Sequence, residues 1–243
     1  MRLALTYLLF NYFANGQILN NPKNTPLYWL GKPNKVKEKK SYPIAFDPSW
    51  VDSLSLLLPC EGIPVPQRIS RLPNAPRKYR SGIHRGVDFF ANWGTPIRAV
   101  AEGSVIRADH NYKEYPAEYR LELLKSSARI GHTPSDIFNS VLLGKSVFLD
   151  HGFDLVPGFR AISIYAHLSS IESNLKPGTL IKAGQLIGKS GNTGTRASTL
   201  NTKKESHLHW EMILQKGKEE IYLGQGVPNP QLYKLLYRIF KKK

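Results

Sequence analysis

Two histidines lie one residue apart in the stretch ESHLHWEM, residues 205–212. In an extended strand, residues i and i+2 project to the same side, so we expect His207 and His209 to face one way while Leu208 and Trp210 face the other. Two neutral imidazoles on one face suit a metal site. The alternative is a surface strand that carries two polar residues on its solvated face.

Two other short segments contain residues with the same chemistry. His84 and Asp88 lie in SGIHRGVDFF, and His167 lies in IYAHLS at the end of a predicted strand. Histidine and carboxylate ligands suit Zn²⁺, whose catalytic sites typically use three protein groups and leave one position for water. A lone His-x-x-x-Asp is more often a satisfied polar pair than a pair of ligands, so the three segments have to be considered together.

Taken in order, the three segments resemble the motifs of the lysostaphin/LytM-type zinc peptidases, peptidase family M23. The resemblance runs from about Ser81 to Leu214 and includes the connecting segments. GVDFFANWGTPIRAVAEGSVI is similar to the family's first hairpin, and GTLIKAGQLIGKSGNTG to its glycine-rich hairpin. The segment TRASTLNTKKES is longer and more basic than the turn usual in the family, which indicates a rebuilt loop beside His207.

The resemblance implies a role for each of five residues. It makes His84, Asp88 and His209 the ligands of a zinc ion. It places His167 and His207 as catalytic residues facing the bound water and the scissile carbonyl. Which of these two is the general base stays open.

The resemblance also implies a fold and an activity. The fold is mainly β, an antiparallel β-sheet groove of the lysostaphin/LytM type with a helical insertion and a C-terminal helix. The activity is zinc-dependent cleavage of the peptide cross-links of bacterial peptidoglycan by metal-activated water, so peptidoglycan peptide stems are the expected partner. The alternative is a non-catalytic module of the LytM type that binds the cell wall or activates another wall hydrolase.

Four further polar residues have simpler interpretations. Glu211 either orients an imidazole such as His209 or forms a plain salt bridge. His151 resembles a structural position of the family, whereas His110 and His132 are expected to face solvent.

The elements that would position these residues are short strands between glycines, within a predicted peptidase domain of residues 81–225. Residues 111–145 break that pattern, because PAEYRLELLKSSARI has apolar residues at helical spacing and TPSDIFNSVLLG predicts a second helical turn. Ser135 is the candidate N-cap of that turn and Gly144 its stop. The segment therefore predicts a helical insertion between two strands.

The two ends of the chain differ from this domain in composition. Residues 1–16 fit a secretory signal peptide, with an N-terminal strand or helix of the domain as the alternative, and residues 17–80 predict an extended arm. Residues 226–243 predict a basic C-terminal helix that docks on the sheet, with attachment to an anionic membrane as the alternative. Its apolar stripe is Leu232, Leu235, Leu236, Ile239 and Phe240.

Composition limits the partners and the compartment. The 243 residues include 34 Lys and Arg against 18 Asp and Glu, a net charge of +16 that favours anionic partners such as wall polymers or membrane surfaces. We expect no specific nucleic-acid partner, because no recognition motif accompanies the charge. The single cysteine, Cys60, excludes an intramolecular disulfide and is expected to be a buried thiol. The predicted location is the periplasm, the cell envelope or the exterior.

Overall fold

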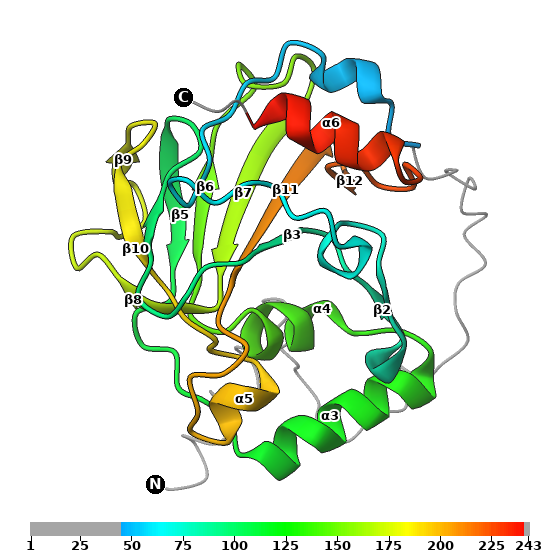
Figure 1. Cartoon of the computed structure of the whole chain (residues 1–243), viewed down its shortest axis with the longest axis vertical. Coiled ribbons are helices and arrows are strands. Elements are labelled where there is room, and N and C mark those ends of the chain that lie inside the picture. The colour runs from blue at the N-terminus through cyan, green and yellow to red at the C-terminus, as the bar shows by residue number, and fades with distance from the viewer. Residues whose placement is uncertain (1–44, 241–243) are drawn as a thin grey trace, which may run out of the picture. The chain divides into compact units, whose positions relative to one another are not determined.

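The central feature of the computed structural model is an antiparallel sheet, and the model describes residues 45–240. The predicted signal peptide, residues 17–44 of the predicted arm, and residues 241–243 lie outside the described residues. In spatial order the main strands are β12 (Glu219–Tyr222), β11 (Leu208–Lys216), β7 (Arg160–Ala166), β6 (Val147–Asp150), β5 (Gly103–Ala108) and β9 (Leu180–Ile181) (Figure 1). A short strand, β3 (Val87–Phe89), pairs with the beginning of β11. The predicted mainly β, antiparallel class is confirmed.

Two smaller sheets accompany this one. The first has the order β4 (Pro96–Arg98), β10 (Leu186–Ser190) and β8 (Leu168–Ile171), and the second joins β1 (Pro76–Arg77) to β2 (Gly82–Ile83). The two hairpins predicted from the glycine-rich segments are wrong. Strand β3 pairs with β11, β4 with β10, and β5 with β6 and β9, while β9 and β10 do not pair with each other. Glycines mark where the chain turns, but they do not select the strand with which it pairs.

The two faces of the main sheet pack against different parts of the chain. Tyr165 and Trp210 face a large core that also includes buried side chains from residues 46–72 and from the C-terminal helix. Ile164 and Ile213 face a smaller core formed with the helical insertion. Because side chains alternate along a strand, His209 lies on the same face of β11 as Ile213, toward the insertion.

The helical insertion is present between β5 and β6. It consists of α3 (Ala117–Ile130), α4 (Ser135–Ile137) and a π-helical turn, η4 (Phe138–Leu142). Ser135 is the first helical residue and not the predicted N-cap, because Pro134 already has the extended backbone of the cap position. Gly144, with a φ of +64°, follows the last turn as predicted.

The segments that precede and follow the sheet both add to the large core. Residues 45–80 contain three 3₁₀ turns, η1 (Pro48–Val51), η2 (Ile69–Arg71) and η3 (Lys78–Arg80), and they bury Cys60 as predicted. The C-terminal helix α6 (Gln231–Ile239) is shorter than the predicted 226–243 and follows Pro228 and Pro230.

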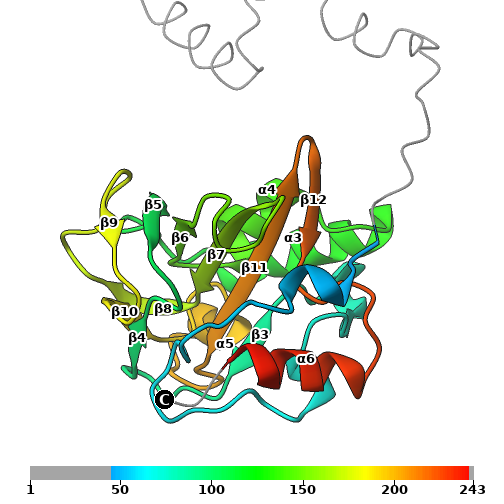
Figure 2. The same ribbon diagram turned by 90° about the horizontal axis from the view of Figure 1, so that it is seen from above.

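Helix α6 docks on the sheet, as predicted. Its buried side chains belong to the large core, so they do not form a membrane-facing stripe. Figure 2 shows α3 and α4 on one side of β11 and α6 on the other. In residues 45–240, none of the helices has the length and apolar character that crossing a membrane requires.

Candidate metal centre

Strand pairing brings together the three residues predicted as ligands. Asp88 on β3 is the cross-strand partner of His209 on β11, and His84 lies on the turn just before β3. Asp88 Oδ1 lies 2.9 Å from His84 Nε2 and 2.9 Å from His209 Nδ1, and these two nitrogens are 3.1 Å apart. All three side chains are buried. Three potential ligand atoms therefore meet at one point.

Fixed acceptors orient the two candidate ligand imidazoles, His84 and His209. The Nδ1–H of His84 donates to the Leu72 carbonyl at 2.8 Å, and the Nε2–H of His209 donates to Glu211 Oε2 at 3.3 Å. A carbonyl can only accept, so the lone pair of His84 is on Nε2, which faces Asp88. His84 Nε2 and Asp88 Oδ1 are both acceptors and lie 2.9 Å apart, so they need a positive centre beside them. That centre is either a proton on His209 Nδ1 or a metal ion.

The electrostatics of this cluster favour a cation. Burial would raise the pKa of Asp88, but the imidazoles of His84, His207 and His209 around its carboxylate hold it well below its usual value. Burial would lower the pKa of His209, but hydrogen bonds to Asp88 and Glu211 raise it to about 9. Burial lowers the pKa of His84. The metal-free site thus holds a carboxylate, a neutral imidazole and an imidazolium.

Glu211 links the candidate metal site to the insertion. Its carboxylate is fully buried, holds His209 through Oε2, and forms an ion pair with Arg85, whose Nε lies 2.8 Å from Oε1. The Arg85 guanidinium lies over the ring of Phe138 in η4, 4.3 Å from its centroid. Both interpretations of Glu211 hold, since it orients His209 and also forms an ion pair.

His167 occupies a strained position beside the three ligands. It joins β7 to β8 with a φ of +61°, which non-glycine residues rarely adopt, and its backbone N–H donates to the Leu143 carbonyl at 2.9 Å. Its Nδ1–H donates to the Thr193 carbonyl at 2.7 Å. Since Nδ1 carries the proton, Nε2 is the nitrogen of His167 that keeps a lone pair, and the ring centroid lies 5.7 Å from that of His209.

His207 completes the group of imidazoles. Its backbone N–H donates to the Gly191 carbonyl at 3.0 Å, and its Nδ1–H donates to the Glu205 carbonyl at 2.7 Å. Its Nε2 lies 3.7 Å from Asp88 Oδ1, and its ring centroid is 4.7 Å from that of His167. Both His167 and His207 therefore present an unprotonated Nε2 near the ligand atoms.

Burial keeps these two imidazoles neutral. It lowers the pKa of His207, and it holds the pKa of His167 well below the ordinary value, with His207 and His209 adding to that effect. A neutral imidazole can accept a proton at Nε2 and later return it.

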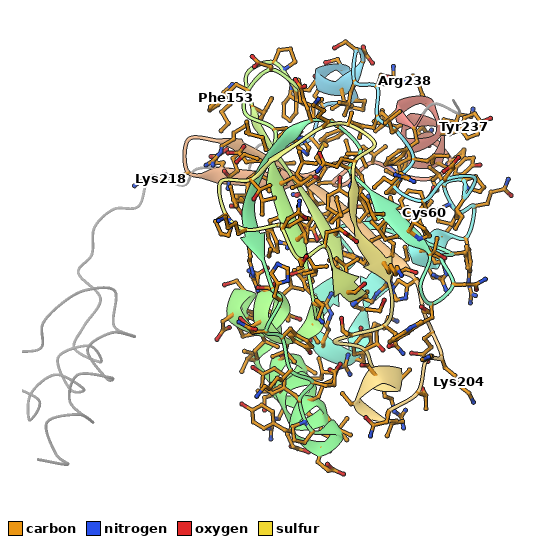
Figure 3. The ribbon with its side chains drawn as sticks, turned by 90° about the vertical axis from the view of Figure 1, so that its left-hand side faces the viewer. Cys60, Phe153, Lys204, Lys218, Tyr237 and Arg238 are labelled. Atoms are coloured by element: carbon orange, nitrogen blue, oxygen red, sulfur yellow. The ribbon has the colours of Figure 1, made fainter. Side chains whose placement is uncertain are left out.

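The cluster opens into a cavity of about 580 Å³. Helical residues of the insertion, including Arg120, Leu121, Leu124 and Phe138, line it together with His84, Asp88, His167, His207 and His209. The rebuilt loop before His207 also contributes, through Glu205. In Figure 3, Lys204 of the same loop projects outward. The insertion and this loop thus both border the candidate site.

The remaining histidines lie elsewhere. His151 is buried, with Nδ1 2.6 Å from the Glu102 carbonyl and Nε2 2.7 Å from Ser163 Oγ, and so has a structural role. His110 and His132 are exposed, as predicted.

Comparison with known proteins gives a family match. Residues 131–221 match the model of Peptidase family M23, a range that includes His167, His207 and His209 and begins after His84 and Asp88. Lysostaphin of Staphylococcus staphylolyticus is 28% identical over 139 residues, which cover 57% of this chain and 20% of that protein. The glycyl-glycine endopeptidase ALE-1 of Staphylococcus capitis is 28% identical over 138 residues, which cover 57% of this chain and 26% of that protein. The chain spans about a fifth to a quarter of the length of these relatives.

A solved structure is similar over more of the chain. The catalytic domain of lysostaphin from Staphylococcus simulans is 24% identical, with a TM-score of 0.34, and the match covers 70% of this chain and 87% of that one. The match to the family model and the two curated relatives agree with the resemblance of the three motifs. Residues 131–221 of the chain are therefore similar to peptidase family M23, to which the resemblance of the three motifs also points.

Proposed function

We propose that this protein is a zinc-dependent endopeptidase that cleaves the peptide cross-links of bacterial peptidoglycan. The observation that supports the proposal most directly is the convergence of Asp88 Oδ1, His84 Nε2 and His209 Nδ1, with distances of 2.9 to 3.1 Å between them.

The chemistry of these three groups fits zinc. Two imidazole nitrogens and one carboxylate oxygen are borderline ligands of the kind zinc prefers, and three protein ligands leave a fourth position open. Each imidazole is oriented by an acceptor on its other nitrogen, Leu72 O for His84 and Glu211 for His209. Asp88 is held on its other oxygen by Arg77 Nη2 at 3.4 Å.

The mechanism follows from the positions of the other two imidazoles. When bound, zinc lowers the pKa of a coordinated water toward about 7 and polarises the peptide carbonyl. His167 and His207 can each take the proton of the attacking water at Nε2, because each holds its own proton at Nδ1 against a carbonyl. The protonated imidazole can then stabilise the developing oxyanion and return its proton to the leaving amine.

Peptidoglycan as the substrate rests on the relatives and on charge. One curated relative is a glycyl-glycine endopeptidase, and a net charge of +16 favours anionic wall polymers. Export to the cell envelope is part of the same proposal, because the substrate lies outside the cytoplasm.

The test measures zinc content and digestion of purified peptidoglycan with the same preparations. The wild type should hold about one zinc ion and release cleaved peptides, as expected for three protein ligands with one open position. His209→Ala should lose both zinc and activity, whereas His207→Ala should keep zinc and lose activity. His132→Ala is the matched control, because His132 is exposed and should change neither.

Three results would contradict the proposal. A wild type without zinc would remove the metal assignment. A zinc-loaded wild type that cuts no wall preparation would favour the alternative, a non-catalytic module that binds the wall or activates another hydrolase. Full activity in His207→Ala would remove the role assigned to that residue.

A further inference from the structure

The cavity beside the candidate metal centre is rich in guanidinium groups. Its charged lining residues are Arg77, Arg80, Arg120 and Arg196, against Asp88 and Glu205. Asp88 already faces the imidazoles and Arg77. Before any metal is counted, the lining therefore carries more positive than negative charge.

Two of the four arginines are used by the structure itself. Arg77 Nη2 donates to Asp88 Oδ2 and to the Ser70 carbonyl. Arg80 is buried, donates to Thr133 Oγ1 and to the Ile83 carbonyl, and its guanidinium lies 5.4 Å from the centroid of the Phe138 ring. These contacts anchor the strand β3 region and the insertion.

The other two arginines have unused donors. Arg120, on α3, donates only from Nε to the Gly194 carbonyl at 3.0 Å, and within residues 45–240 its two amino groups have no hydrogen bond or ion pair. Arg196 begins the short helix α5 (Arg196–Thr199), is exposed, and its guanidinium makes no hydrogen bond or ion pair with the described residues. Neither group therefore needs to break a contact in order to bind a ligand.

Backbone connections link both arginines to the segment that orients the candidate catalytic residue His167. The Gly194 carbonyl, which accepts from Arg120, is one residue from the Thr193 carbonyl, which accepts from His167 Nδ1. Arg196 follows two residues later and lines the same cavity.

We propose that Arg120 and Arg196 form a subsite that binds a carboxylate of the peptide substrate next to the bond that is cut. The inference rests on the proposed endopeptidase function and adds the chemical class of the substrate. A planar guanidinium offers paired N–H donors that match a carboxylate, and such charge-assisted bonds are stronger in a partly buried cleft than in water. Leu121 and Leu124 of the same helix line the cavity and offer apolar contact to the aliphatic part of the peptide.

The experiment compares two forms of one substrate. Soluble peptidoglycan fragments are used either with their free carboxylates intact or with those carboxylates converted to carboxamides. For each form, kcat/KM and the dissociation constant are measured with zinc-loaded wild type, Arg120→Gln, Arg196→Gln and Arg129→Gln. Arg129 is the matched control, because it lies on α3, is exposed, and is not among the residues that line the cavity.

The wild type and Arg129→Gln should prefer the intact fragments by about ten- to a hundredfold, the range expected for one lost charge-assisted hydrogen bond. Arg120→Gln and Arg196→Gln should lose most of that preference, so that the ratio of kcat/KM between the two forms falls toward one in each variant. Equal cleavage of both forms by the wild type, or an equal loss in Arg129→Gln, would overturn the subsite and leave the endopeptidase intact. If neither form is cleaved, the proposed function fails, and the ratio of the two dissociation constants still tests the subsite.

Discussion

Each of the four imidazoles at the candidate site donates one ring N–H to a fixed acceptor and presents its other nitrogen to the centre. The acceptors are the carbonyls of Leu72, Thr193 and Glu205 and the carboxylate of Glu211. Only Glu211 was visible in the sequence as a candidate. A backbone carbonyl acts through its position and not through a side chain, so no residue type indicates it. The imidazoles themselves could be predicted, because their types and spacing follow the motifs.

Replacing Glu211 with glutamine tests how strongly this orientation matters. The amide can still accept from His209 Nε2, but it carries no charge to raise the basicity of the ring, and it leaves Arg85 without its ion pair. We expect zinc affinity to fall by about ten- to a hundredfold. The measurement is zinc competition with a chromophoric chelator. Glu220→Gln is the control, because Glu220 is exposed and its side chain bonds, among residues 45–240, only to Gln215. Unchanged affinity in Glu211→Gln would mean that the ring is held by packing alone.

The stability of the metal-free protein should depend on pH through His209. The pKa of His209 is raised to about 9 in the folded protein, above the ordinary 6.5. The stabilisation that protonated His209 gives the fold is therefore fully present below about pH 6.5 and is lost as the pH rises through 9. The loss should be of the order of 3 kcal/mol. The pKa values of His84, His167 and His207 are lowered, so their contributions change below pH 6.5, outside this window.

Urea unfolding at pH 6.5 and pH 9, with zinc removed by a chelator, measures this effect. His209→Gln serves as the comparison, because it lacks the titrating group and should lose much less stability over the same range. An equal loss in both proteins would assign the pH dependence to other groups.

At the scale of elements, the site depends on pairings between segments that are far apart in the sequence. Asp88 meets His209 only because β3 pairs with β11. The sequence predicted the strands, the helical insertion and the C-terminal helix, since periodicity and turn residues are local properties. It predicted two hairpins that do not exist, since the partner of a strand is selected by long-range packing. Gly86 shows this, because a Cβ there would lie 2.8 Å from His209 Cε1, a constraint that appears only once the strands are paired.

Glu114 connects the insertion to the segment around Thr193, Gly194 and Ser198, which follows β10. Its Oε2 accepts from the backbone N–H of Gly194 at 3.0 Å and from Ser198 Oγ, next to the Thr193 carbonyl that orients His167. We therefore expect Glu114→Gln to lower kcat by about ten- to a hundredfold, because His167 is displaced, while zinc content and KM change little. Activity on purified peptidoglycan and zinc content measure this together. Glu118→Gln, at an exposed position of α3, is the control. Loss of zinc in Glu114→Gln would show that the loop also supports the ligands.

At the scale of the whole molecule, the site and the large core lie on opposite faces of the same strands. Phe240, just after α6, packs edge-on against Phe89 of β3 and Trp210 of β11, with ring centroids 5.5 and 5.0 Å apart. These two aromatic residues are the sequence neighbours of Asp88 and His209. The C-terminal segment thus supports, from behind, the two strands that hold candidate ligands in front.

Zinc binding and this packing should contribute separately to stability. At a free zinc concentration of a hundred times its dissociation constant, zinc should stabilise the protein by about 2.7 kcal/mol, a gain that a chelator removes and that His209→Ala lacks. Phe240→Ala should cost about 3 to 5 kcal/mol, because Phe240 is buried, and Tyr237→Ala should cost far less, because Tyr237 is exposed on α6 (Figure 3). Since Phe240 touches no candidate ligand, zinc should stabilise Phe240→Ala as much as it stabilises the wild type. Urea unfolding of the wild type, His209→Ala, Phe240→Ala and Tyr237→Ala, each with zinc and with chelator, measures this. A smaller gain in Phe240→Ala would instead show that the core behind β3 and β11 sets the spacing of Asp88 and His209, so that folding of the core and assembly of the metal site are one cooperative event.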